Sequence, residues 1–207
     1  MLSETQLTEL TAIYRQGADD AANALSIWLE RPVRISVEHV EQLGLTQAGG
    51  LLGTADEPVC ACVMSLQGTI SGQLMLAFDD ASGLVLADFI LSRKSSRSTN
   101  WEEVELSAAL ETANIVGCAY LNALSRCTLK VPTVGGVEGH TTCIPSPPHF
   151  VRDFGPSLMQ FVLLNHYPVP DVVFLTRTEF CIDNAQVTWD LLFLPDTESL
   201  SYLQATL

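Results

Sequence analysis

The chain has 207 residues, of which 47% are hydrophobic and 16% are charged, so it can build a domain with a sizeable core. Its formal net charge is −14, from 24 acidic and 10 basic residues. This balance argues against nucleic acid as a ligand, because a phosphate backbone needs a basic surface, and against an anionic membrane surface for the same reason.

The first half predicts a helix, three strands and a second helix. In chain order these are a helix over 4–30, a strand over 32–39, a glycine-rich loop over 44–53, strands over 58–66 and 69–78, and a helix over 82–92. The two later strands are joined at Gln67-Gly68, which is a hairpin signal. In the second of them, alternation separates Leu74 and Leu76 from Met75 and Ala77.

The second half follows a polar, serine-rich linker over residues 93–100. Its expected elements are a helix over 101–127, a strand over 129–134, a long Gly/Pro loop over 135–156, strands over 157–166, 171–182 and 186–195, and a short helix from 197.

A repeated tetrapeptide indicates an internal duplication. Asn23-Ala-Leu-Ser26 and Asn122-Ala-Leu-Ser125 are offset by 99 residues (122 − 23), and each precedes a proline-containing extended stretch. We therefore expect residues 1–207 to form a single pseudo-two-fold domain, with halves of about 1–93 and 100–207. The hairpins predict an α+β fold with a largely antiparallel sheet and packed helices.

The helix over 101–127 carries a polar stripe. Ser107, Glu111 and Asn114 recur at i, i+4 and i+7 and therefore share one side of the helix. An apolar stripe is expected to face the core, and its members are Leu106, Leu110, Ala113, Val116, Tyr120 and Leu124. Without further context, Glu111 and Asn114 could simply be solvent-facing helix residues.

Three segments together resemble the CheC/CheX/FliY family of chemotaxis phosphatases. The family pattern is Asp or Ser, Glu four residues later and Asn three further, and residues 107–125 match it with the longer run Ser-Ala-Ala-Leu-Glu-Thr-Ala-Asn-Ile-Val-Gly-Cys-Ala-Tyr-Leu-Asn-Ala-Leu-Ser. Residues 70–78 and 189–200 look like the family's glycine-containing strand and its terminal strand and helix. The resemblance covers most of the chain and also implies the α+β fold.

The resemblance implies a phosphatase that removes the aspartyl phosphate of a CheY-like receiver domain. Asn114 would orient the hydrolytic water, Glu111 would contact the receiver's lysine, and Ser107 would position the helix surface. Because Asn is a poor acid, base or nucleophile, no covalent intermediate on this chain is implied. We expect no cofactor on this chain, since the Mg²⁺ would belong to the receiver. A CheD-like deamidase is a second partner to consider.

The first half does not repeat the pattern. Subtracting 99 maps Ser107, Glu111 and Asn114 onto Thr8, Ala12 and Arg15, so we expect one site, in the second half. The family also has a proline after its active helix, at a position that is Val137 here, with Pro132 nearby. The degraded first copy keeps an alternative open: a non-catalytic scaffold that binds receivers, or a flagellar switch component.

Other motifs favour structural roles and a cytoplasmic location. The N-terminal residues 1–9 lack the basic and apolar regions of a secretory signal, and no apolar run approaches the ~20 residues that cross a bilayer. The spacings Cys60-x-Cys62 and His140-x2-Cys143 suit packed, reduced thiols better than zinc. Residues 144–150, Ile-Pro-Ser-Pro-Pro-His-Phe, predict a stiff surface loop, with a polyproline ligand as the alternative.

Overall fold

The computed structural model describes residues 1–52, 57–93, 98–128, 142–164, 172–182 and 185–207. The elements of the first half are α1 (Glu4–Leu29), β1 (Val33–Val37), β2 (Glu41–Leu43), α2 (Leu45–Leu51), β3 (Val59–Gly68), β4 (Gly72–Asp79) and α3 (Asp80–Ile90). Those of the second half are α4 (Glu103–Thr128), β5 (Cys143–Pro145), β6 (His149–Asp153), α5 (Gly155–Leu164), β7 (Val173–Ile182), β8 (Ala185–Pro195) and α6 (Thr197–Thr206). The same order of elements therefore occurs twice.

The strands of the described residues form one antiparallel sheet that interleaves the two halves. Its order is β1-β7-β8-β4-β3-β5, with β2 also paired to β7 and β6 also paired to β3. Each half thus places its first two strands beside the third strand of the other half. The last strands of the two halves, β4 and β8, pair at the centre. This pseudo-two-fold α+β arrangement confirms the predicted fold class.

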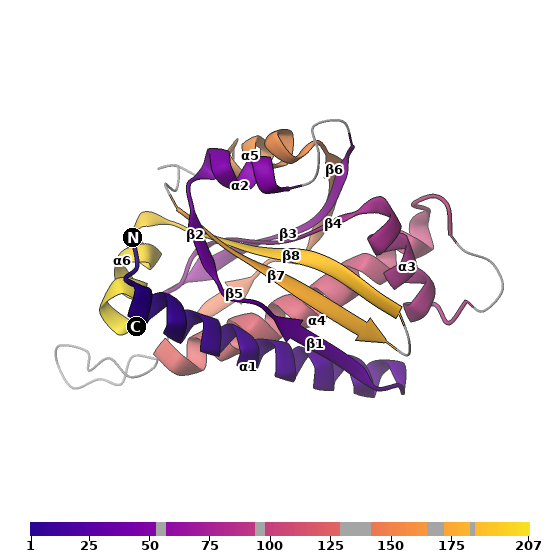
Figure 1. The fold of residues 1–207 in the computed structure, drawn as a ribbon, viewed down its shortest axis with the longest axis horizontal. Helices are drawn as coiled ribbons and strands as arrows, with labels where there is room; N and C mark the ends of the chain where they lie inside the picture. The colour runs from indigo at the N-terminus through magenta and orange to yellow at the C-terminus, as the bar shows by residue number, and fades with distance from the viewer. Residues whose placement is uncertain (53–56, 94–97, 129–141, 165–171, 183–184) are drawn as a thin grey trace.

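Helices cover both faces of the sheet (Figure 1). α1 and α4 lie side by side on one face, α2 and α5 lie on the other, and α6 lies at the end where both termini are found. The buried hydrophobic side chains form two clusters, one on each face of the sheet. The larger core cluster packs against α1 and α4, and the smaller one packs against α2 and α5. In β4, Leu74 and Leu76 belong to the larger cluster while Met75 and Ala77 belong to the smaller one, which confirms the predicted alternation.

The two long helices meet at a glycine. A Cβ atom on Gly17 of α1 would lie 2.9 Å from the Cα atom of Tyr120 on α4. The rings of Tyr14 and Tyr120 pack edge to face, with centroids 5.4 Å apart. Gly17 therefore allows the two helices to approach closely enough for the aromatic pair to form.

Two sequence predictions on the opposite face are wrong. Residues 157–166 were expected to form a strand, but they lie mainly in α5, whose buried residues Leu158, Met159 and Val162 have helical spacing. Pro156 stands in the first turn, where a proline's missing N–H costs nothing. A short apolar run does not by itself distinguish a strand from a buried helix, and here the packing decides.

The expected glycine-rich loop over 44–53 contains helix α2. Gly49 of α2 is buried, and a Cβ atom there would lie 3.2 Å from Cγ of Met159 in α5. The contact between α2 and α5 stabilises a segment whose glycines disfavour a helix. Tertiary packing therefore overrides local propensity at this position.

Several boundaries move by a few residues. α3 is capped by Asp79, which accepts from the backbone N–H of Ser82, so the helix begins two residues before the expected residue 82. The β3–β4 turn occupies residues 69–71, just after the expected Gln67-Gly68. The predicted strand 129–134, with Pro132, and Val137 lie outside the described residues.

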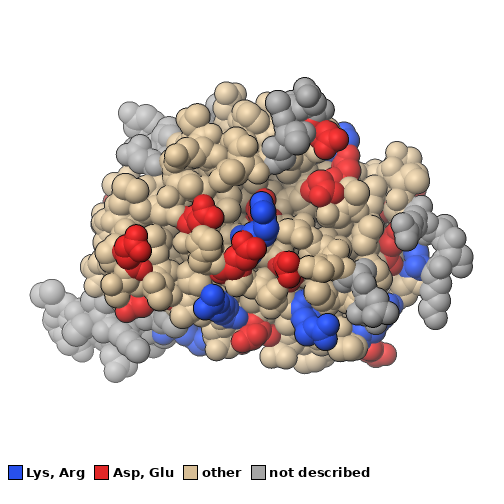
Figure 2. Space-filling view, in the orientation of Figure 1, with Lys and Arg blue, Asp and Glu red and all other residues tan. Residues whose placement is uncertain are grey.

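The surface carries many acidic side chains, as the composition predicts, but basic side chains lie among them. On the face formed by α1, β1 and β2, acidic and basic side chains are interspersed (Figure 2). In the described part of the chain, every helix is too short or too polar to cross a bilayer.

Candidate functional site

A groove of about 910 Å³ runs along the N-terminal half of α4. One wall is a single side of α4, and the other is residues 145–148, the end of β5 and the turn that leads to β6. The predicted site residues Ser107, Glu111 and Asn114 all line this groove. The structure thus brings the three together on an open surface, next to a segment that lies far away in the sequence.

The polar groups of the site are largely free to meet a partner. Ser107 and Glu111 are exposed and Asn114 is half-buried. Within the described residues, the side chains of Ser107 and Glu111 form no hydrogen bond or ion pair. Cys118 donates a long hydrogen bond from Sγ to Oδ1 of Asn114, at 3.7 Å. Because a thiol is a weak donor, this contact leaves the carboxamide able to bind a stronger partner.

The apolar stripe of α4 is divided between the core and the groove. Ala113, Val116, Tyr120 and Leu124 are buried in the larger core cluster, as predicted. Leu106 and Leu110 were also expected to face the core. Both are half-buried and line the groove, and Leu110 also packs against the larger core cluster, as predicted. The apolar stripe therefore borders the groove near the start of α4 and is fully buried further along the helix.

Gly117 brings α4 close to the sheet. A Cβ atom on Gly117 would lie 2.2 Å from Cε of Met64 and 3.3 Å from Cδ2 of Leu74. Any side chain there would displace the buried Met64 side chain. Gly117 lies about one turn after Asn114, so this close packing sets the distance between the Asn114 end of the polar stripe and strand β3.

A buried carboxylate holds the start of α4. Glu105 is only 2% exposed, and its Oε1 accepts from Ser98 Oγ at 3.0 Å and from the Arg93 guanidinium. The backbone N–H of Ser98 in turn donates to Asp88 of α3 at 3.0 Å. This network connects the end of α3 to the first turn of α4, and so positions the groove's N-terminal end.

A second network connects α3 to β6, the strand that follows the opposite wall. Asp80, at the start of α3, accepts three hydrogen bonds from the guanidinium of Arg152 on β6, one from Trp101 Nε1 at 2.8 Å and one from Cys60 Sγ at 3.0 Å. The Arg152 hydrogen bonds are the largest cause that lowers the pKa of Asp80 below its ordinary value. The Trp101 ring packs between Phe78 and Phe150.

Sequence reasoning missed this network because its members come from four separate segments. One local feature could have indicated it. Asp79 already caps α3, so the aspartate that follows it, Asp80, is not needed as a cap and is available for another contact.

The cysteines behave as packing residues. Cys60 and Cys62 lie on the same face of β3, are fully buried and are free thiols. Burial raises the pKa of Cys62 to about 12. Across the described ranges, no three His, Cys, Asp or Glu side chains are grouped so as to hold a metal ion, while His140 lies outside those ranges.

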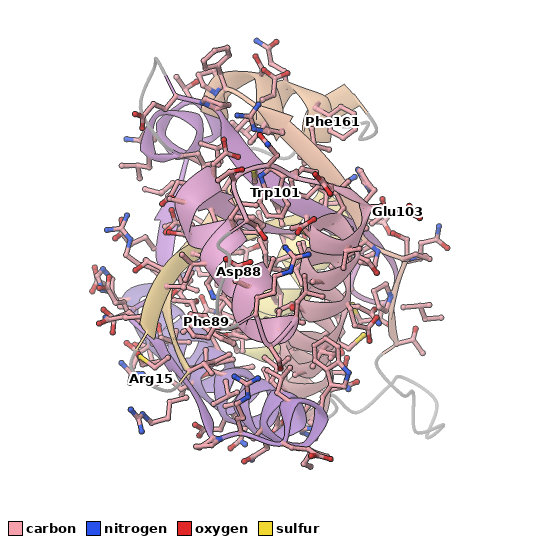
Figure 3. The ribbon with its side chains drawn as sticks, turned by 90° about the vertical axis from the view of Figure 1, so that its right-hand side faces the viewer. Arg15, Asp88, Phe89, Trp101, Glu103 and Phe161 are labelled. Carbon is pink, nitrogen blue, oxygen red and sulfur yellow. The ribbon has the colours of Figure 1, made fainter. Side chains whose placement is uncertain are left out.

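The first-half counterpart of the groove is closed. Thr8, Ala12 and Arg15 are exposed on α1, but Thr11, the equivalent of Leu110, accepts the backbone N–H of Val40 at 3.0 Å. The Val40 side chain is only 3% exposed. Figure 3 places Arg15 on the side of the molecule away from Glu103, which begins the α4 groove.

Comparison with known proteins identifies the fold. No family model matches the chain. Thermotoga maritima FliY is similar over the whole of both chains, with a TM-score of 0.75 at 18% identity. The structure of a FliG–FliM complex from H. pylori matches with a TM-score of 0.66 at 14% identity, over 97% of this chain and 100% of that chain.

A chemotaxis protein CheX from Desulfovibrio desulfuricans matches with a TM-score of 0.50 at 10% identity, over 88% of this chain and 99% of that one. At such identities the likeness establishes the fold alone. The chain therefore has the fold of the CheC/CheX/FliY type, with its predicted polar stripe on an open groove.

Proposed function

We propose that the protein is an aspartyl-phosphate phosphatase that acts on a phosphorylated CheY-like receiver domain. The observation that carries the proposal is the position of Glu111 and Asn114 on one open side of α4, with the Glu111 carboxylate unpaired within the described residues. A rigid helix that presents a carboxylate and a carboxamide one turn apart can enter another protein's active site without rearranging.

In this proposal Asn114 supplies position and not covalent chemistry. Its carboxamide Oδ1 accepts a hydrogen bond from a water molecule and holds that water in line with the phosphorus atom. The water oxygen bonds to phosphorus, the bond between phosphorus and the aspartyl oxygen breaks, and inorganic phosphate leaves. Glu111 binds a cationic side chain of the receiver and sets the register of docking. The aspartyl phosphate and its Mg²⁺ belong to the receiver.

A second candidate is a binding module without turnover, either a receiver-binding scaffold or a flagellar switch component. The observation that favours it is the fold comparison, in which FliY and FliM match more completely than CheX does. In that case the groove binds a receiver or a flagellar protein, and Asn114 contributes to affinity only.

The deciding experiment is a time course of phosphate release from a phosphorylated CheY-like receiver in excess over the protein. Asn114→Ala should lower the rate at least a hundredfold, because the water loses its orienting group. Asn122→Ala is the matched control, since Asn122 is exposed on the same helix and does not line the groove. A wild-type protein that binds the receiver but releases no extra phosphate would favour the binding module.

A further inference from the structure

The α4 groove contains more than the two proposed active residues. Its lining divides into an apolar floor and wall, made by Leu106, Leu110, Pro145, Pro147 and Pro148, and two carboxylates, Glu103 and Glu111. No Lys, Arg or His is found among the described residues that line it. This arrangement favours a partner surface with apolar and basic side chains, and the following steps name that chemistry.

The two carboxylates stand at opposite ends of the apolar floor. Glu103 and Glu111 are eight residues apart on α4, which corresponds to about 12 Å along the helix axis. Leu106 and Leu110 lie between them on the same side. Both carboxylates are exposed, and within the described residues neither forms an ion pair. Figure 3 shows Glu103 on the outer side of α4.

The opposite wall is rigid before any partner binds. Ser146 exchanges hydrogen bonds with Ser65 of β3: the Ser65 N–H donates to Ser146 Oγ at 3.0 Å, and the Ser146 N–H donates to Ser65 O at 2.8 Å. Three prolines surround this anchor, and proline has little backbone freedom to lose. An apolar side chain that enters the groove therefore meets a preformed surface, which reduces the entropic cost of binding.

We propose that this groove recognises a receiver surface on which two basic side chains, about 12 Å apart, flank an apolar one. Glu111 binds one cation beside the reacting phosphate, and Glu103 binds the second cation about two helical turns further from it. Leu110 and Pro147 hold the apolar side chain between them. The inference rests on the proposed function, because that function supplies the receiver, and it adds Glu103 and Pro147 as residues that determine specificity.

The experiment measures receiver binding and turnover separately. Dissociation constants are determined for the beryllofluoride- and Mg²⁺-loaded receiver at 50 and 300 mM NaCl, and phosphate release gives KM and kcat. Glu103→Gln should weaken binding about two- to fivefold at low salt and reduce the salt dependence, as expected for an exposed ion pair. Pro147→Ala should weaken binding by a similar factor without changing the salt dependence. Both should raise KM and leave kcat unchanged.

Glu198→Gln is the matched control, because Glu198 is an exposed carboxylate in the first turn of α6, as Glu103 is in α4. One outcome is that the wild-type protein releases phosphate, while Glu103→Gln and Pro147→Ala have the same KM and the same salt dependence of binding as wild type. That outcome would overturn the inference and leave the proposed function intact. Absent turnover, with binding that still depends on Glu103 and Pro147, would overturn the proposed function and support the inference. A wild-type protein that does not bind the receiver would overturn both.

Discussion

The hydroxyl of Thr11 accepts the backbone N–H of Val40 across the first-half counterpart of the α4 groove, at 3.0 Å. The same hydroxyl donates to Leu7 O at 2.8 Å, so Thr11 is tied on both sides. The first half therefore differs from the second in two ways: its helix lacks the carboxylate and the carboxamide, and the space beside that helix is filled by the buried Val40.

From this closure we predict that restoring the side chains does not restore a site. In the Asn114→Ala background, the additional changes Ala12→Glu and Arg15→Asn should leave phosphate release at the level of Asn114→Ala alone. Residues 12 and 15 are exposed, but Val40 fills the space beside Thr11, so a receiver surface finds no groove there to dock in. The same two changes with Asn114 intact should leave turnover at the wild-type level. Renewed phosphate release in the triple variant would show that the first half is accessible.

Glu111→Ala should weaken docking more than chemistry. Loss of one exposed charge pair raises the KM for the phosphorylated receiver about two- to fivefold and leaves kcat close to wild type. Arg15→Ala, at the first-half position equivalent to Asn114, should change neither constant. Steady-state kinetics on the three proteins check this, and a kcat that falls with Arg15→Ala would move the site to the first half.

Gly17→Ala should destabilise the fold by about 1–3 kcal/mol, because its Cβ atom would press against the backbone of Tyr120, and a backbone cannot rotate away. Urea unfolding measures the change. Gly50→Ala is the matched control, since Gly50 is exposed in α2 with no atom within 4 Å of a Cβ there. That control should stabilise by about 0.5–1 kcal/mol through helix propensity. Equal effects at the two positions would contradict the role given to Gly17.

The Asp80–Arg152 network predicts a dependence of stability on pH. Because the folded-state pKa of Asp80 lies below its unfolded value, its contribution is complete above the ordinary carboxylate pKa of about 4, and is lost as pH falls below that value. Asp80→Asn should cost about 1 kcal/mol at pH 7, a modest figure because the carboxylate is partly exposed.

The measurement is urea unfolding of wild type and variant at pH 7 and pH 3. The difference in unfolding free energy between them should shrink at pH 3, where the wild-type advantage is being lost. Asp19→Asn, a change at an exposed carboxylate of α1, should leave the difference from wild type the same at both values of pH. A gap between wild type and Asp80→Asn that grows at pH 3 would contradict the cause given for the lowered pKa.

The amino-acid sequence by itself determined the features that repeat over a few residues. The two long helices, the two-faced alternation of β4 and the stripe of Ser107, Glu111 and Asn114 all follow from local spacing. Each was readable because a helix or strand places neighbouring side chains at fixed angles, whatever lies around it. The repeated Asn-Ala-Leu-Ser likewise indicated two halves before any contact between them was known.

The tertiary structure decided what depends on segments that are distant in the chain. Helices α2 and α5 form because they pack on each other, although glycine and a short apolar run locally favour other structures. The groove exists because Pro147, anchored beside Ser65, faces the first turns of α4, while Val40 fills the corresponding space in the first half. Local spacing carries no information about such neighbours, since they are set by how the two halves interleave in one sheet.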